Sequence, residues 1–224
     1  MYATGLGEGD AEQGIVGVPI AEKMPGIQEL YAALSRDVLR NDMILSDVIR
    51  ALEESRSPIL LTERKDHLEY FATRLQRIAR HLVVLQGGMG AKAQRTVHAQ
   101  LAAIPSGEER VVLATGRYIG EGFDDARLDT LFLAMPVSWK GTLVQYTGRL
   151  HRLHPGKREV RIFDYVDREV PMLLRMFEKR LRGYRAIGYA RGEAPLGYAE
   201  PSDERVVEYD EDAVDAYGEE DDFA

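Results

Sequence analysis

The chain has 224 residues, of which 45% are hydrophobic and 29% charged, and its formal net charge is −8. This length suffices for one full α/β domain with appendages. Because the chain contains no cysteine, disulfide scaffolds, thiolate metal sites, iron–sulfur clusters and a cysteine nucleophile are excluded. The apolar runs fall far short of the roughly 18 residues that a membrane span requires, and no secretory signal is visible. We therefore expect a soluble, cytoplasmic protein.

The negative charge is unevenly distributed. Residues 200–224 hold twelve acidic residues and one arginine, which leaves 28 basic and 25 acidic residues in the rest of the chain. Residues 1–199 therefore carry about +3, so the net charge does not exclude a partner rich in phosphate. We interpret residues 191–224 as an acidic, disordered tail and the glycine-rich residues 1–26 as a loop or linker.

Between these ends, amphipathic helices alternate with short apolar strands. Apolar residues at helical spacing from Ile27 to Val38 predict a first helix, and Asn41 is a candidate cap for a second, so residues 27–56 form a helical lead-in. Apolar runs bounded by turn residues predict five strands, at residues 58–62, 81–86, 110–115, 129–134 and 160–165. Further helices are predicted at residues 66–78, 90–103, 142–152 and 170–189. This alternation predicts a parallel sheet covered on both faces.

The segment GGMGAKAQR follows a predicted strand and has the appearance of a phosphate-binding loop. A P-loop requires the pattern G-x-x-x-x-G-K-[ST]. Alignment on Lys92 places Gln86, Ala91 and Ala93 where glycine, glycine and a hydroxyl residue are needed. The segment is therefore interpreted as a tight turn between a strand and a helix, and we find no Walker A loop in the chain.

Four residues of the segment QYTGRLHR share one face of the helix predicted at 142–152. Gln145, Gly148, Arg149 and Arg152 are spaced at i, i+3, i+4 and i+7. Two arginines projecting from a rigid helix are suited to bind phosphate, because the guanidinium fork matches the phosphate oxygens. Taken alone, the pair also fits a solvated face with salt bridges to neighbours.

Three segments together resolve this ambiguity. PILLTERKDHLEYF, VVLATGRYIGEGFDDARLDTLFLAMP and QYTGRLHR resemble motifs IV, V and VI of the second RecA-like lobe of superfamily-2 helicases, in the same order and at similar spacing. The likeness covers about residues 57–166 and is closest to restriction-type and repair-type enzymes. It implies that residues 57–190 form a RecA-like three-layer sandwich, of the P-loop NTPase type, with a mainly parallel sheet of at least five strands and flanking helices.

The resemblance also implies roles for individual residues at the nucleotide. Arg152 matches the arginine finger, Arg149 matches the companion that reaches the γ-phosphate, and Gln145 would orient the attacking water or the phosphate. An arginine finger stabilises the charge that spreads over the transferred phosphoryl group. The remaining nucleotide-binding residues implied by the likeness are Gly122, Asp124 and Gly148.

A second group of residues is implied to contact nucleic acid. Thr115 matches the threonine that binds a backbone phosphate, and Gly87 and Gly88 match a loop that approaches the backbone. Thr62 ends the motif IV strand, and for this residue a structural role is an equal alternative. The basic residues of the last helix, Arg180 among them, lie mostly off its apolar stripe and either line a nucleic-acid path or form a solvated face.

The resulting hypothesis is that the chain is the C-terminal lobe of an ATP-dependent helicase or translocase. ATP and Mg²⁺ would be held by a P-loop lobe that this chain lacks, supplied in the same polypeptide or by a separate one, and no metal site is predicted within the chain itself. Nucleic acid is the expected partner, with DNA favoured over RNA, and the isolated chain is expected to lack ATPase activity. Two alternatives remain: an ATPase-inactive nucleic-acid-binding module, and a regulatory subunit that docks on a helicase.

Overall fold

The structure is a computed structural model that describes residues 25–116, 125–137 and 143–190. Nearly all of the predicted linker and the whole predicted acidic tail lie outside these ranges. The helices are α1 (Ile27–Arg36), α2 (Val38–Glu53), α3 (Lys65–Leu75), α4 (Ala91–Ala103), α6 (Val144–Leu150) and α7 (Pro171–Ala186). The strands are β1 (Pro58–Thr62), β2 (Leu82–Leu85), β3 (Val111–Thr115), β4 (Thr130–Leu133) and β5 (Arg161–Asp164).

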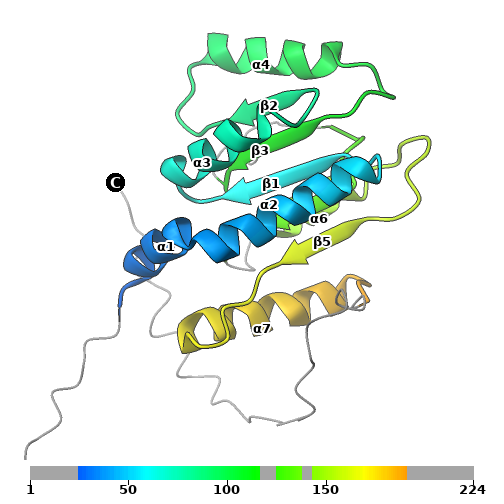
Figure 1. The fold of residues 1–224 in the computed structure, drawn as a ribbon. Helices are drawn as coiled ribbons and strands as arrows, with labels where there is room; N and C mark the ends of the chain where they lie inside the picture. Colours follow the sequence, from blue (N-terminus) through cyan, green and yellow to red (C-terminus); the bar gives the residue numbers. More distant parts are fainter. Residues whose placement is uncertain (1–24, 117–124, 138–142, 191–224) are drawn as a thin grey trace, which may run out of the picture. The chain divides into compact units, whose positions relative to one another are not determined.

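The five strands form one sheet in the order β2-β3-β1-β4-β5, and every neighbouring pair is parallel (Figure 1). Each strand lies within one residue of the range that the apolar runs predicted. The chain runs from β1 to the edge strand β2 on one side, and later from β4 to β5 on the other side. The strand order therefore reverses around β1, and ligands of open α/β sheets bind outside the carboxyl ends of the strands at such a reversal.

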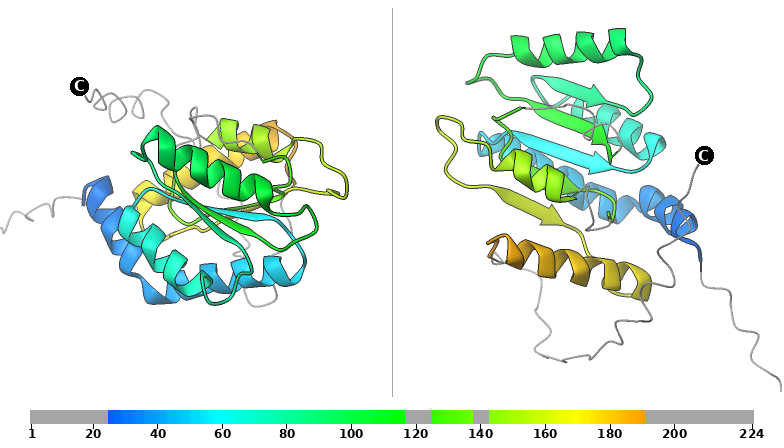
Figure 2. Two further views of the ribbon diagram at one scale, coloured as in Figure 1. Left: turned by 90° about the horizontal axis from the view of Figure 1, so that it is seen from above. Right: turned by 180° about the vertical axis from the view of Figure 1, so that it is seen from behind.

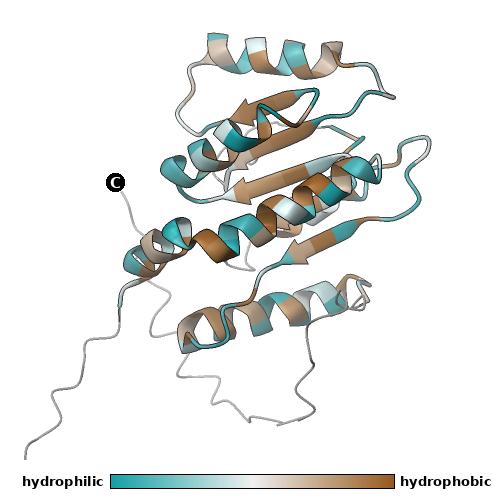
Figure 3. Cartoon of the chain, viewed as in Figure 1, coloured by the Kyte–Doolittle hydropathy of each residue, from teal (hydrophilic) through white to brown (hydrophobic). Residues whose placement is uncertain are grey.

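Helices cover both faces of the sheet, which explains why the strands are apolar on both sides. Figure 2 shows α1, α2 and α3 on one face and α6 on the other. The hydropathy colouring follows this arrangement, with apolar strands between helices of mixed character (Figure 3). The fold class predicted from the sequence, a RecA-like sandwich with a parallel sheet of at least five strands, is confirmed.

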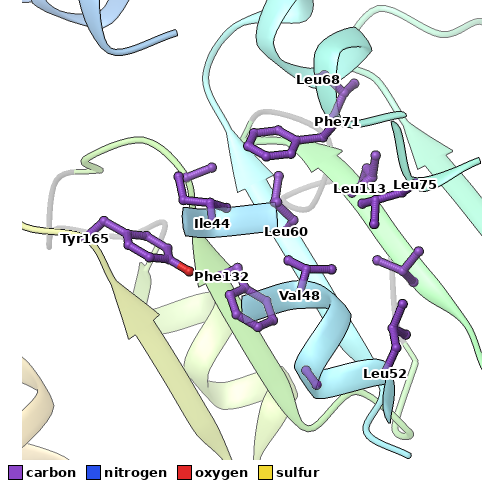
Figure 4. Close-up of a cluster of buried hydrophobic side chains, with 13 residues drawn as sticks. Ile44, Val48, Leu52, Leu60, Leu68, Phe71, Leu75, Leu113, Phe132 and Tyr165 are labelled. Carbon is purple, nitrogen blue, oxygen red and sulfur yellow. The ribbon is translucent and has the colours of Figure 1, made fainter. Parts of the chain in front are cut away.

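The main core lies between the sheet and the helices α2 and α3. Leu60 and Phe132 point to this side and pack with Ile44, Phe71 and other fully buried side chains (Figure 4). Ile59, Leu61 and Leu131 alternate with them and meet α6 on the opposite face. A smaller cluster of Tyr31, Leu34, Met135 and Leu173 joins α1 and α7 to the end of β4. No helix of the described residues is long and apolar enough to cross a bilayer.

The prediction that Asn41 caps the second helix is wrong. The helix α2 begins at Val38 with Asp37 as its cap, because the Asp37 side chain accepts a hydrogen bond from the backbone N–H of Arg40 at 3.0 Å. Asn41 is instead buried within the helix, with 1% of its surface exposed. Its amide makes contacts at the carboxyl edge of the sheet.

Candidate nucleotide and nucleic-acid interface

The residues predicted to contact nucleic acid meet at the carboxyl edge of the sheet. Thr62 and Thr115 end the adjacent strands β1 and β3 and are partners in the register. The backbone N–H of Gly87 donates to the Thr115 hydroxyl at 2.8 Å, which fixes the turn after β2 against β3. Gly88 follows in the left-handed region with φ +83°, which favours glycine. The structure thus brings all four predicted residues together.

A chain of buried hydrogen bonds connects Thr62 to the helical lead-in. The amide nitrogen of Asn41 donates to the carbonyl of Ser35 at 3.0 Å, so the amide oxygen of Asn41 faces Nε2 of His67 at 2.8 Å. Nε2 must therefore carry the imidazole proton, and Nδ1 accepts from the Thr62 hydroxyl at 2.9 Å. Because Thr62 is 1% exposed and its hydroxyl proton is committed to His67, these contacts give the residue a structural role.

This network predicts a stability that depends on pH. Burial, together with the nearby Arg40 guanidinium, lowers the pKa of His67 to about 4. An unfolded histidine titrates at about 6.5, so between these values the unfolded chain binds more protons than the folded chain. We expect the free energy of unfolding to fall by about 3 kcal/mol as the pH drops from about 6.5 to about 4, since one pKa unit corresponds to about 1.4 kcal/mol.

Urea unfolding at several pH values between 7.5 and 4 measures this loss. The control is His67→Gln, which cannot titrate, so the pH dependence due to other groups is measured separately. The wild-type chain is expected to lose more stability across this window than the variant does. Equal slopes for the two proteins would show that His67 does not titrate as described.

The helix α6 carries the predicted arginine motif and packs on the sheet face opposite α2. The hydroxyl of Tyr146 donates to the carbonyl of Gly116, directly after Thr115, and anchors the helix to the end of β3. Burial raises the pKa of Tyr146, so this phenol remains a donor. Gly148 is exposed, and a Cβ at this position would meet nothing within 4 Å. The packing of the described residues therefore does not require glycine here.

Arg149 is only partly exposed and lines an apolar pocket between α6 and the sheet. Ile59, Leu61 and Leu131 form the strand side of this pocket. One terminal nitrogen of Arg149, Nη1, is buried and has no hydrogen-bond partner among the described residues. A buried donor without an acceptor costs about 1–3 kcal/mol, and Arg40 and Arg110 also carry such atoms.

The helix is shorter than the predicted range of 142–152, which changes the setting of Arg152. The helix α6 ends at Leu150, with His151 as its cap, so Arg152 lies in the exposed turn that follows. Gln145 lies on α6, but its side chain lies outside the described part of the structure, as do the whole residues Gly122 and Asp124. The structure therefore places Gly148, Arg149 and Arg152 around the end of one helix. The roles predicted for Gln145, Gly122 and Asp124 stay predictions.

Three side chains outside the arginine motif hold the segment between β4 and α6. Arg40 donates to the carbonyl of Ala134 at 2.6 Å, and the hydroxyl of Tyr31 donates to that of Pro136. Arg180 donates to the carbonyl of Val137 at 3.0 Å. Helices from both ends of the domain thus fix the backbone that leads into the arginine motif.

The placement of Arg180 corrects a prediction. It does not lie on an exposed basic face, because its side chain is 1% exposed and forms a two-pronged ion pair with Asp164 at 2.7 and 2.9 Å. Periodicity alone assigned Arg180 to a face of α7 that is polar in the sequence. This face meets the carboxyl end of β5, where Asp164 neutralises the guanidinium.

Comparison with solved structures agrees with this architecture. T4 UvsW matches with a TM-score of 0.58 and 17% identity, over 73% of this chain and 36% of that chain. The C-terminal part of the Fun30 ATPase domain matches with a TM-score of 0.53 and 9% identity, over 68% of this chain and 53% of that chain. The described residues share the RecA-like α/β fold of these structures. This RecA-like lobe thus spans about a third of UvsW and half of the Fun30 chain.

No family model and no curated protein matches the sequence of this RecA-like lobe. At these low identities the structural likeness establishes the fold, and the chemistry must be argued from the residues themselves. Within the described ranges, no group of three or more histidine, aspartate or glutamate side chains is arranged to hold a metal ion.

Proposed function

We propose that this chain is the arginine-donating lobe of an ATP-dependent helicase or translocase. In this proposal Arg152 and Arg149 face the γ-phosphate of an ATP molecule bound on a separate P-loop lobe. They would stabilise the negative charge that develops during phosphoryl transfer, while Gln145 orients the attacking water. Gly122, Asp124 and Gly148 would contact the nucleotide from the same side.

The observation that carries the proposal is the environment of Arg149. Arg149 lies on an apolar pocket wall, and its buried Nη1 has no hydrogen-bond partner among the described residues. Its guanidinium suits an anion with several oxygens, because the planar fork binds two of them at once. A nucleotide phosphate is such an anion.

The surroundings of the motif also suit an approaching second lobe. Leu153, next to Arg152, is 97% exposed, and Val144 at the start of α6 is 46% exposed. Together with the open space above Gly148, these residues form a surface that a partner could cover. ATP bound at this junction would bring Mg²⁺ with it, held by acidic residues of the P-loop lobe.

The nucleic acid would run across the carboxyl edge of the sheet. Thr115 and the amides of the turn at Gly87 and Gly88 are suited to bind phosphate oxygens, since hydroxyl and backbone N–H groups are common backbone contacts. Tyr146 links this edge to α6 through its bond to Gly116. Closure of the two lobes around ATP would therefore move the nucleic-acid contacts as well.

The experiment that tests this function mixes the chain with a helicase first lobe that carries a P-loop. We expect ATP hydrolysis only when both lobes and a DNA or RNA strand are present. Affinity for the strand should fall steeply with salt, because phosphate contacts release counterions. A mixture that binds the strand without hydrolysing ATP would instead favour the inactive binding module, and hydrolysis by the chain alone would contradict the division into two lobes.

Replacing Arg149 should lower the ATPase activity without lowering the stability of the fold. In Arg149→Met the flexible apolar side chain fills the pocket and removes the buried unpaired donor. We expect the free energy of unfolding to remain the same or rise by about 1 kcal/mol, whereas the two-lobe ATPase falls by about 100-fold or more. Urea unfolding and phosphate release measure the two effects. A loss of stability without loss of activity would show that Arg149 is a packing residue.

A further inference from the structure

Lys157 bridges the end of the arginine motif and the segment that follows Asp124. Its ammonium group donates to three backbone carbonyls, those of Leu150, Arg152 and Ala126, the last two at 3.0 Å. An ammonium has three N–H donors, so these three bonds satisfy it completely. The side chain is only partly exposed, and its position is therefore set by these contacts.

A tight turn returns Lys157 to the helix that it contacts. The backbone N–H of Lys157 donates to the carbonyl of His154 at 3.1 Å, and Gly156 has φ +88°. Glycine at the third position provides the positive φ that a type II turn requires, and proline is common at the second position. The sequence His154-Pro155-Gly156-Lys157 thus places an ammonium group at the carboxyl end of α6, where helix carbonyls lack partners.

The other end of the bridge is firmly held. Ala126 lies between Asp125 and Arg127, which form an ion pair at 2.7 Å with both side chains largely buried. Arg127 also donates to the carbonyls of Ile104 and Leu101 at 2.8 and 3.0 Å. The carbonyl of Ala126 is therefore a fixed point, against which Lys157 can hold a turn that is otherwise exposed.

We propose that Lys157 is a positioning residue for Arg152, whose backbone it holds at a set place relative to Ala126. It touches neither nucleotide nor nucleic acid in this proposal, which rests on the proposed function of Arg152. The ammonium fixes the backbone, and the guanidinium of Arg152 acts on the phosphate. Without this bridge the turn at residues 151–153 would sample several conformations, of which few present Arg152 correctly.

The test compares Lys157→Met, which keeps the length of the side chain but has no donors, with Lys157→Arg, which keeps the charge and the donors. The control is Arg77→Met, an exposed basic residue that follows α3. In the two-lobe ATPase, Lys157→Met should lower kcat by about 10- to 100-fold and leave the KM for ATP unchanged, because a small misplacement of a catalytic group costs up to about 100-fold. Lys157→Arg should recover a part of the loss, and Arg77→Met should behave as wild type.

Amide hydrogen exchange on the isolated chain provides a readout that does not depend on ATPase activity. Loss of charged hydrogen bonds should speed exchange at residues 150–153 by about tenfold in Lys157→Met, with the strands β1 and β3 unchanged. Wild-type exchange at residues 150–153, or an unchanged kcat where the wild-type pair is active, would overturn the proposal. If the wild-type pair shows no ATPase, the proposed function fails, and the exchange result alone decides whether Lys157 orders the turn.

Discussion

Replacing Arg152 with alanine is expected to lower the two-lobe ATPase by a factor of about 10³ to 10⁵, the range found for arginine fingers. The side chain is exposed at the end of α6 and lies outside the two core clusters, so the fold should survive its removal. Because a lysine presents a single charge in place of a planar fork, Arg152→Lys should restore little of the activity. Phosphate release under saturating ATP measures the change in kcat.

The matched control for Arg152 is Arg158→Ala, which removes another exposed arginine of the same segment. We expect this variant to hydrolyse ATP at nearly the wild-type rate. Wild-type activity in Arg152→Ala would contradict the arginine-finger assignment, whereas equal losses in both variants would indicate a general effect of positive charge.

Arg180→Met should destabilise the domain by about 3–5 kcal/mol, because it leaves the carboxylate of Asp164 buried without its partner. The side chain of Asp164 is 7% exposed, and among the described residues the hydroxyl of Tyr184 at 3.1 Å would remain as its side-chain partner. The variant also loses the bond to the carbonyl of Val137. A loss of this size is a large part of the 5–15 kcal/mol that stabilises a typical domain.

Urea unfolding of Arg180→Met and of the control Arg175→Met, an exposed arginine of the same helix, measures this effect. The double variant Arg180→Met with Asp164→Leu should recover much of the stability, since replacing a whole buried ion pair with apolar residues is often close to neutral. A loss below about 1 kcal/mol in Arg180→Met would show that the pair is well solvated.

The strands were predictable because each is a short apolar run between turn residues, and burial on both faces leaves little room for polar side chains. The sheet residues Leu60 and Leu131 illustrate this pattern. The motif resemblance placed the two arginines and the edge residues Thr115 and Gly87, because these depend on residue type and spacing within one segment. Such features are local, and the sequence displays them directly.

The residues that hold the site in place could not be predicted in this way. Arg40, Tyr31 and Arg180 act on carbonyls that are 43 or more positions away in the sequence, and nothing local marks their targets. The contact between His67 and Asn41, which are 26 positions apart, could not be predicted for the same reason. The Pro155-Gly156 sequence before Lys157 is a local turn signal, but no role was predicted for this turn or for Lys157.

The central claim is that the arginines of this chain contact ATP bound by another lobe, and an affinity measurement tests it most directly. The dissociation constant of the chain and a P-loop lobe is measured with ADP alone and with ADP and aluminium fluoride, which mimics the transferred phosphoryl group. Because the arginines act on the transition state, the analogue should tighten binding by about 100-fold or more in the wild-type chain, and this gain should disappear in Arg152→Ala. Equal affinity with and without the analogue in the wild-type chain would contradict the account.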